Sequence, residues 1–178
     1  SGPTNSMRGA AHLSGMKDGL VADIGGTTTD IGVLVGGYPR ESSVPVDIGG
    51  VRTNFRMPDI LALGLGGGSI ITPDASAVGP QSVGHRLLEE ALVFGGATLT
   101  ATDIAVAKGA EIGVPALVAH LPEATVARAS DAMHAPIDEG IHRLTTRAGA
   151  IDLVLVVVGA VLVHLPLPPL PPPPPPTM

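Results

Sequence analysis

The stretch VADIGGTTTDIGVLVGG, from Val21 to Gly37, decides the fold. Its β-branched residues give way to two glycines, three threonines and an aspartate, and then β-branched residues resume. This pattern predicts two strands joined by a short polar loop. A purely structural turn needs no flanking acid and no run of three hydroxyl groups, whereas a loop that holds a phosphate and its metal ion uses both. The loop is therefore the first candidate site.

The predicted elements around this loop form the start of a sheet. Strands are expected at Leu20–Ile24 and Ile31–Val35, and the pair Gly36–Gly37 makes a hairpin turn. A third strand is expected at Glu41–Ile48, where polar and apolar residues alternate. The order of strand, loop, strand, turn and strand indicates antiparallel pairing. A short helix, Asn5–Gly15, is expected before the first strand.

Further elements are expected beyond Gly50. The longest of them, Glu123–Arg147, is predicted to be one long helix or two, because Pro136 lies inside it and is the expected break. In chain order the expected elements are an apolar segment at Ile60–Leu65, a strand at Ile70–Ile71, a helix at Val83–Val93, a polar cap at Thr98–Asp103, a helix at Ile104–Lys108, the long helix at Glu123–Arg147 and a buried strand at Leu153–Val158.

Composition excludes several function classes. The chain has 178 residues, with 10 Lys and Arg against 16 Asp and Glu, and a net charge of −6. Its basic residues are scattered, which argues against a nucleic-acid partner. It has no cysteine, which excludes disulfides, a zinc–thiolate site and a cysteine nucleophile and fits a cytoplasmic location. The longest apolar run, Leu153–Val163, is too short to span a bilayer, so no membrane partner is expected.

The first glycine loop has the residues that a phosphate and a hard cation require. Glycines let the backbone approach an anion closely, and successive N–H groups and threonine hydroxyls then donate to it. Asp23 at the strand end is the candidate catalytic residue and the candidate Mg²⁺ ligand. The alternative is a plain β-hairpin with a Gly-Gly turn. The candidate cofactor-binding residues of this loop are Gly25, Gly26, Thr27, Thr28, Thr29 and Asp30.

A second glycine loop, Gly64–Ser69, follows about forty residues later. It has the composition of another anion-binding nest, although a tight bend at a strand end explains it equally well. Neither loop is a Walker A loop, because no Gly-Lys-Ser/Thr follows, and neither is a dinucleotide fingerprint, because a strand follows instead of a helix. The candidate cofactor-binding residues here are Gly66, Gly67, Gly68 and Ser69.

Five ordered motifs together resemble the hydantoinase/oxoprolinase family. They are SGPTNSMRGAAHLSG, DIGGTTTDIGVL, GLGGGSI, VGPQSVG and FGGATLTATDIAVAKG. The resemblance is strong over roughly residues 1–113 and weaker over Glu123–Val158. It implies an α/β, actin-like ATPase fold of the ribonuclease-H type, with a mixed sheet and flanking helices. One lobe, residues 1–163, and a proline-rich tail, residues 164–178, are expected.

The resemblance also implies a chemistry. DIGGTTTD resembles a second phosphate loop, with Asp23 working with Mg²⁺ and with Gly25, Gly26 and Thr27 in contact with the phosphates of ATP. ATP would phosphorylate the oxygen of a cyclic amide, of the hydantoin or 5-oxoproline type, and the ring would then open. The other lobe of the site is expected from a missing segment or a partner subunit. Two alternatives are an ATP-dependent ketone carboxylase subunit and a truncated, non-catalytic module.

The sequence differs from the family pattern in three places. Leu61 stands where the family usually has a histidine. The first phosphate loop of the family is absent. After the last predicted strand the pair Gly159–Ala160 stands where the family has a glycine-rich loop, and the proline tail follows Val163.

Other polar residues have both a functional and a plainer interpretation. His134, Asp138 and His142 are spaced four residues apart, which would place them on one face of a helix. They could bind a metal ion or form a solvated helix face. His85 faces a pocket or lies on the surface. The threonines of Thr98–Asp103 cap a helix or face a substrate. The polar loop residues Arg52, Asn54 and Arg56 recognise an anion or form salt bridges to Asp59 or Glu41.

Overall fold

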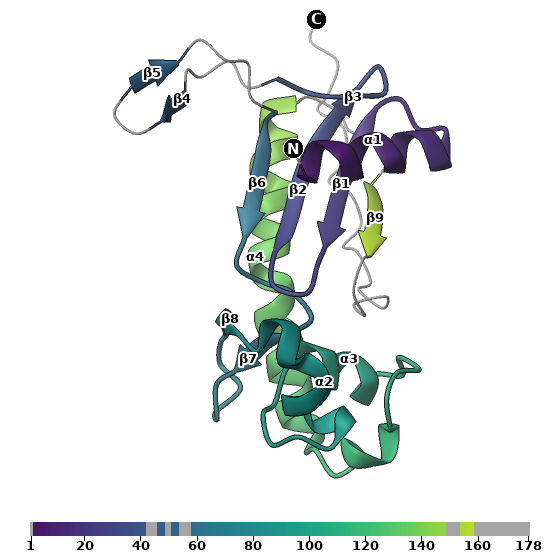
Figure 1. The fold of residues 1–178 in the computed structure, drawn as a ribbon, viewed down its shortest axis with the longest axis vertical. Helices are drawn as coiled ribbons and strands as arrows, with labels where there is room; N and C mark the ends of the chain where they lie inside the picture. Colours follow the sequence, from purple (N-terminus) through teal and green to yellow (C-terminus); the bar gives the residue numbers. More distant parts are fainter. Residues whose placement is uncertain (1, 42–45, 49–50, 54–57, 149–153, 159–178) are drawn as a thin grey trace, which may run out of the picture.

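The computed structural model describes residues 2–41, 46–48, 51–53, 58–148 and 154–158. Its core is a mixed sheet with a helix on each face, and a smaller helical part follows at one end of the sheet (Figure 1). The predicted proline tail at 164–178 and the pair Gly159–Ala160 lie outside the described residues.

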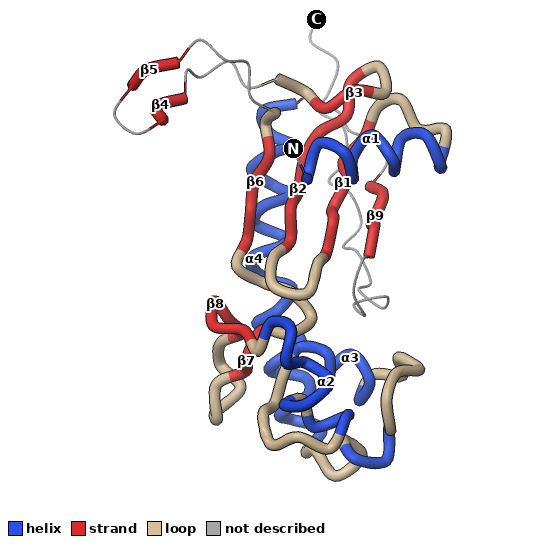
Figure 2. Tube along the Cα trace, viewed as in Figure 1, coloured by secondary structure: helices blue, strands red, loops and turns tan. Residues whose placement is uncertain are grey.

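The central sheet is built on the hairpin that the sequence predicts. Strands β1 (Gly19–Ile24) and β2 (Thr29–Val35) pair antiparallel from Gly19 opposite Leu34 to Ile24 opposite Thr29. The other edge of β2 pairs with β3 (Tyr38–Pro39) at one end and with β6 (Ile60–Leu63) at the other. Strand β9 (Val154–Val158) runs parallel to β1 (Figure 2).

Helix α1 (Gly2–Ser14) covers one face of the sheet. Its Met7 packs against Val21 and Leu34 in a small apolar cluster. Gly32 on β2 permits this packing, because a Cβ there would lie 2.6 Å from Met7 Sδ. The helix crosses the sheet near β3, and the end of β1 and β2 that carries the first glycine loop extends beyond it (Figure 1).

Helix α4 (Glu123–Ala148) covers the opposite face. Its buried side chains, among them Met133 and Ile137, join Leu20 and Ile31 of the strands in the main core. The predicted break at Pro136 is wrong, since the helix runs through it. Proline removes one helical hydrogen bond, and the packing of the residues beside it against the core offsets that loss.

The smaller part lies at the glycine-loop end of the sheet. Its hairpin consists of β7 (Ser69–Ile71) and β8 (Val78–Ser82), and α3 (Ala101–Ala107) packs against α4. The rest is four short turns of helix: η1 (Gly84–Arg86), α2 (Leu87–Glu90), η2 (Leu92–Phe94) and η3 (Pro115–Leu117).

Two predicted elements differ from the structure. The single helix expected over Val83–Val93 is wrong: Ala91 is extended, at φ −71° and ψ 145°, and bridges to Thr98, which interrupts the helix. For the third strand, expected at Glu41–Ile48, the described residues differ in their pairing: Glu41 bridges to Pro58, and β4 (Val46–Ile48) pairs antiparallel with β5 (Val51–Thr53) in a separate two-stranded sheet. Among the helices of the described chain, none is long and apolar enough to cross a membrane.

Candidate functional site

The first glycine loop projects from the end of the central hairpin. Ile24 and Thr29 form its last strand pair, and the N–H of Gly25 donates to the Thr28 carbonyl at 2.8 Å. Gly26, Thr27 and Thr28 are exposed. Within the described chain, the backbone N–H groups of these three residues donate no hydrogen bond to the protein. The loop therefore offers three backbone donors to a ligand.

Two carboxylates lie beside this loop. Asp23 and Asp30 are directly opposite each other in the β1–β2 register, so their side chains share one face of the sheet. That face is the one α1 covers elsewhere, because Val21 and Leu34 pack against α1 from the same side. Both acids are half-buried. Burial raises the pKa of Asp30, and the negative charge of Asp23 raises it further.

This pair of carboxylates fits a magnesium ion. Mg²⁺ is commonly held by one or two protein carboxylates together with the phosphates of its substrate and several waters. Asp23 and Asp30 supply two such carboxylates next to free N–H donors. Among the described residues, no group of three or more His, Cys, Asp or Glu side chains could hold a metal ion by itself.

The second glycine loop differs from the first, because it is buried and its N–H groups are occupied. Gly67 N–H donates to the Gly25 carbonyl at 3.0 Å, and Gly68 N–H donates to the Gly26 carbonyl at 2.7 Å. The N–H of Gly66 donates to Ser69 Oγ at 2.9 Å, and that of Ser69 to the Gly66 carbonyl at 3.0 Å. Phosphate binding by this loop stays a prediction. What the structure shows is a backbone support for the first loop.

Glycine is required in the second loop for contact with protein backbone. A Cβ at Gly66 would lie 2.5 Å from the nitrogen of Thr27 and 2.6 Å from the Gly25 carbonyl oxygen. A Cβ at Gly68 would lie 2.8 Å from Ser82 Oγ. By contrast, a Cβ at Gly26 would meet no atom within 4 Å. The two loops thus use glycine for different partners.

Thr29 is the one residue of the triple threonine that faces the core. It is fully buried, and its Oγ1 donates to the Leu65 carbonyl at 2.7 Å, which ties the two loops together. The predicted phosphate contact of Thr29 stays a prediction, and in the structure its hydroxyl is used within the protein. The exposed Thr27 and Thr28 keep their hydroxyls available.

The start of α3 supports the second loop in turn. Thr102 is fully buried, and both its N–H and its Oγ1 donate to the Gly67 carbonyl, at 2.9 and 2.8 Å. Asp103 is also buried and accepts from Val93 N–H and from the N–H and hydroxyl of Thr100. The cap interpretation of this segment is therefore confirmed. The hydrogen bonds from Thr102 to Gly67 were not predicted. The one feature of the sequence that pointed to them was a further threonine between the capping residues Thr100 and Asp103.

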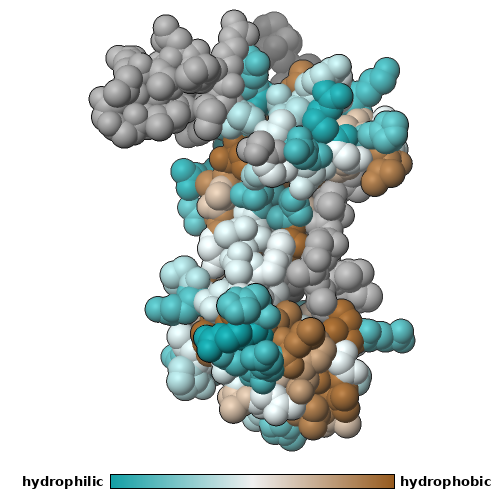
Figure 3. Space-filling model, viewed as in Figure 1, coloured by the Kyte–Doolittle hydropathy of each residue, from teal (hydrophilic) through white to brown (hydrophobic). Residues whose placement is uncertain are grey.

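Three other groups of polar residues were candidates in the sequence. His134, Asp138 and His142 share an unbroken helix, but His142 is exposed and His134 Nδ1–H donates to the Ser130 carbonyl at 2.6 Å. His85 is exposed. The smaller part of the molecule, at the bottom of the view, presents both hydrophilic and hydrophobic surface (Figure 3). Only the backbone of Arg52 is described, and Asn54 and Arg56 lie outside the described residues.

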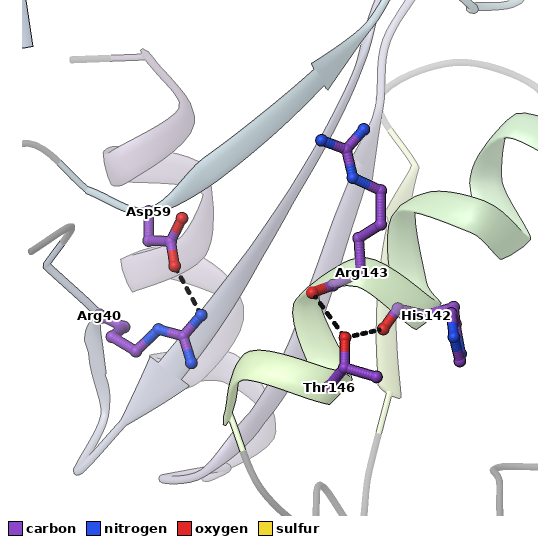
Figure 4. A network of polar contacts seen from close by, with 5 residues as sticks. All are labelled: Arg40, Asp59, His142, Arg143 and Thr146. Atoms are coloured by element: carbon purple, nitrogen blue, oxygen red, sulfur yellow. Dashed lines mark hydrogen bonds and ion pairs between the residues drawn. The ribbon is translucent and has the colours of Figure 1, made fainter. Parts of the chain in front are cut away.

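Asp59 pairs with a different arginine from those that the sequence suggested. Arg40 Nη2 lies 2.5 Å from Asp59 Oδ2 (Figure 4). Leu61, which replaces the family histidine, is opposite Ile31 and packs with the main core. It also lines a cavity of about 90 Å³ together with Asp59 and Arg143. This cavity adjoins the start of β6, at the opposite end of that strand from the glycine loops.

Comparisons with known proteins agree with this arrangement. The profile of the hydantoinase/oxoprolinase family matches residues 1–142. The acetophenone carboxylase gamma subunit of Aromatoleum aromaticum is 31% identical over 115 residues, in a match that covers 61% of this chain. The chain spans 16% of the length of that subunit.

Two solved structures share the fold. An ATP-dependent caprolactamase from Pseudomonas jessenii has a TM-score of 0.59 and 23% identity, over 83% of this chain and 25% of that one. A nucleotide-free acetone carboxylase has a TM-score of 0.56 and 19% identity, over 83% of this chain and 24% of that one. The fold is therefore an α/β arrangement also found in ATP-dependent enzymes. Because the family profile matches well over half of the residues of this chain, the chain belongs to the hydantoinase/oxoprolinase family.

Proposed function

We propose that this chain supplies the phosphate-binding loop of an ATP-dependent enzyme that opens cyclic amides of the hydantoin or 5-oxoproline type. One observation carries the proposal: three free backbone N–H groups at Gly26, Thr27 and Thr28 adjoin the carboxylates of Asp23 and Asp30. Donors and acids in this order suit a phosphate accompanied by a divalent cation. The ATP dependence of the two similar solved enzymes supports ATP as the source of that phosphate.

Each part of the first loop has a role in this proposal. The N–H groups of Gly26 and Thr27 donate to phosphate oxygens, and the exposed hydroxyls of Thr27 and Thr28 add donors. Asp23, with Asp30 beside it, holds Mg²⁺, which when bound neutralises charge on the transferring phosphoryl group. Gly66–Ser69 contributes by fixing the backbone of the first loop. The predicted actin-like lobe and the cytoplasmic location are parts of this proposal.

The chemistry follows from the weakness of the substrate as an electrophile. The carbonyl oxygen of a cyclic amide attacks the γ-phosphorus of ATP, an O–P bond forms, and the bond to the β-phosphate oxygen breaks to release ADP. Water then adds to the activated ring carbon, and the C–N bond breaks as the nitrogen takes up a proton, which opens the ring and leaves an acyl phosphate. A second water hydrolyses the acyl phosphate to the carboxylate and releases inorganic phosphate. Fixed N–H donors meet the negative charge that spreads over the phosphoryl oxygens during transfer.

The chain supplies only one part of such a site. It spans a quarter or less of the relatives that it matches. The cyclic amide and a second phosphate-contacting loop would therefore meet residues of another segment or of a partner subunit. We place that second part on the face of the sheet that α1 covers elsewhere, at the glycine-loop end where Asp23 and Asp30 lie.

A ketone carboxylase subunit is the second candidate. The observation that favours it is the 31% identity to an acetophenone carboxylase gamma subunit. Phosphorylation of an enolate oxygen places the same charge on the same loop, so the two candidates share the role of Asp23 and Gly26. They differ in substrate, and turnover of ATP with a cyclic amide or with a ketone plus bicarbonate distinguishes them.

The test is calorimetric titration of the chain with Mg-ATP. Asp23→Ala removes one carboxylate, and Gly26→Val fills the open space above the loop, where a Cβ touches no protein atom. We expect both variants to lose binding while staying folded. Gly9→Ala is the control, since its Cβ also meets no atom within 4 Å and it lies in α1. No binding by the folded wild-type chain at millimolar nucleotide would favour the non-catalytic module.

A further inference from the structure

We propose that Thr102 is a positioning residue, which aims the backbone N–H of Thr27 at the ligand through two intervening peptide groups. The inference deepens the proposed function and rests on it for the identity of the ligand. The positioning itself rests on hydrogen bonds within the protein. It gives helix α3, which lies in the smaller part of the molecule, control over a loop on the central sheet.

The first link joins Thr102 to the peptide group between Gly67 and Gly68. The N–H and Oγ1 of Thr102 both donate to the Gly67 carbonyl, at 2.9 and 2.8 Å. A carbonyl oxygen has two lone pairs, so these two donors saturate it. All three residues are buried, which strengthens the bonds and excludes water as a substitute partner.

The second link joins that peptide group to the one between Gly26 and Thr27. The N–H of Gly68 donates to the Gly26 carbonyl at 2.7 Å, the shorter of the two backbone bonds between the glycine loops. Donors on the Gly67 carbonyl polarise its peptide group and make the Gly68 N–H a better donor. The two links therefore reinforce each other.

The series ends at an exposed donor. In a trans peptide the carbonyl and the N–H point in opposite directions. Because the Gly26 carbonyl points inward to Gly68, the N–H of Thr27 in the same peptide group points away from the second loop. Thr27 is exposed, and its N–H has no acceptor among the described residues. Thr102 thus orients a donor that it does not touch.

Glycines at 66 and 68 are what permit this series. A Cβ at Gly68 would lie 3.1 Å from the Gly26 carbonyl oxygen, and one at Gly66 would lie 2.5 Å from the nitrogen of Thr27. The second loop can therefore approach the first closely enough for direct backbone bonds. A side chain at either position would separate them.

The test compares two buried threonines that are two residues apart. Thr102→Val removes the hydroxyl bond to Gly67 and leaves the backbone bond. Thr100→Val removes another buried hydroxyl bond, to Asp103 Oδ2 at 2.8 Å, which is not part of the series. Because its acceptor is a carboxylate, Thr100→Val should lose at least as much stability as Thr102→Val, so a larger effect of Thr102→Val on the first loop reports position. Thr102→Ser keeps the hydroxyl and serves as the rescue variant.

Two readouts are taken on the full chain. Amide hydrogen exchange should become several-fold faster at Gly68 in Thr102→Val, and should stay near wild type in Thr100→Val and Thr102→Ser. The dissociation constant for Mg-ATP should rise about five-fold in Thr102→Val only, which corresponds to the net value of about one hydrogen bond.

Unchanged exchange at Gly68 in Thr102→Val, or an equal acceleration in Thr100→Val, overturns the proposal. If the wild-type chain binds Mg-ATP, an unchanged dissociation constant in Thr102→Val also overturns the proposal. If the wild-type chain binds no nucleotide, the proposed function fails, and the exchange comparison still decides whether Thr102 positions the loop.

Discussion

The two glycine loops look alike in sequence and do opposite things in the structure. Gly25–Thr28 is largely exposed and has three N–H groups without a protein acceptor in the described chain, whereas Gly66–Ser69 is buried and all four of its N–H groups donate to protein. In the first loop, a Cβ at Gly26 would meet no protein atom within 4 Å. In the second, glycine leaves space for the first loop. A glycine-rich stretch therefore signals close approach to a backbone, and only burial shows what approaches.

The sharpest way to break this comparison is an alanine at Gly66. Its Cβ would lie 2.5–2.6 Å from three backbone atoms of the first loop, none of which can rotate away. We expect a loss of about 3 kcal/mol in the free energy of unfolding, as for other overpacked sites. Urea denaturation measures it.

Gly26→Ala is the matched control for that change. Its Cβ meets no atom within 4 Å, so we expect the free energy of unfolding to stay within about 0.5 kcal/mol of wild type. Equal losses at Gly26 and Gly66 would contradict the distinction between an open loop and a supporting loop.

An alanine at Gly68 should have a smaller effect. Its nearest neighbour is Ser82 Oγ at 2.8 Å, a side-chain atom that can rotate, although the Gly26 carbonyl oxygen lies 3.1 Å away. We expect a loss of about 1.5 kcal/mol. In a double-mutant cycle Ser82→Ala should recover part of it, and strict additivity of the two changes would show that Ser82 is not the obstacle.

The triple threonine offers a third comparison within one loop. Thr29→Val removes the buried hydroxyl bond to the Leu65 carbonyl and should cost about 1 kcal/mol in thermal or urea unfolding. Thr28→Val changes an exposed residue and should leave stability unchanged while weakening Mg-ATP binding. A loss of stability in Thr28→Val and none in Thr29→Val would contradict the burial of Thr29.

The smallest expected effect concerns the two carboxylates. The pKa of Asp30 is raised in the folded protein, by burial first and by Asp23 second, so the folded state holds this proton more tightly than the unfolded state. Stability should therefore fall as pH rises from the ordinary aspartate range through the raised pKa. Asp30→Asn should remove that slope and raise stability at pH 7 by about 0.5 kcal/mol or less, since solvent screens a half-exposed pair. Urea midpoints measured from pH 3 to pH 7 check this, and an unchanged slope in the variant would assign it to another group.

Much of the fold was predictable from local pattern. The β-branched runs on both sides of the first glycine loop, the turn at Gly36–Gly37 and the polar segment Thr98–Asp103 are local signals. The structure confirms the hairpin and the helix that they predict, although the helix begins at Ala101 and not at Ile104. Pro136 and Ala91 were misjudged, because packing against the core continues one helix and a bridge to Thr98 interrupts the other.

The sequence predicted which residues form the candidate site, but it did not predict which of them contact other parts of the protein and which are left exposed. Sequence distinguishes glycine from other residues, but it does not show whether Gly67 donates to an anion or to the Gly25 carbonyl. That depends on how β6 pairs with β2, a contact between segments about thirty residues apart. The role of Thr102 depends on the same long-range packing.

The most direct test of the account is an amide-resolved NMR titration of the chain with Mg-ATP, combined with hydrogen exchange. We predict that nucleotide shifts the amide signals of Gly26, Thr27 and Thr28, and that Gly67 and Gly68 remain protected from exchange with and without nucleotide. Rapid exchange at Gly67 and Gly68 in the free chain, followed by protection on adding nucleotide, would contradict the account. The second loop would then be a ligand-binding nest, and its bonds to the first loop would not be what holds the site.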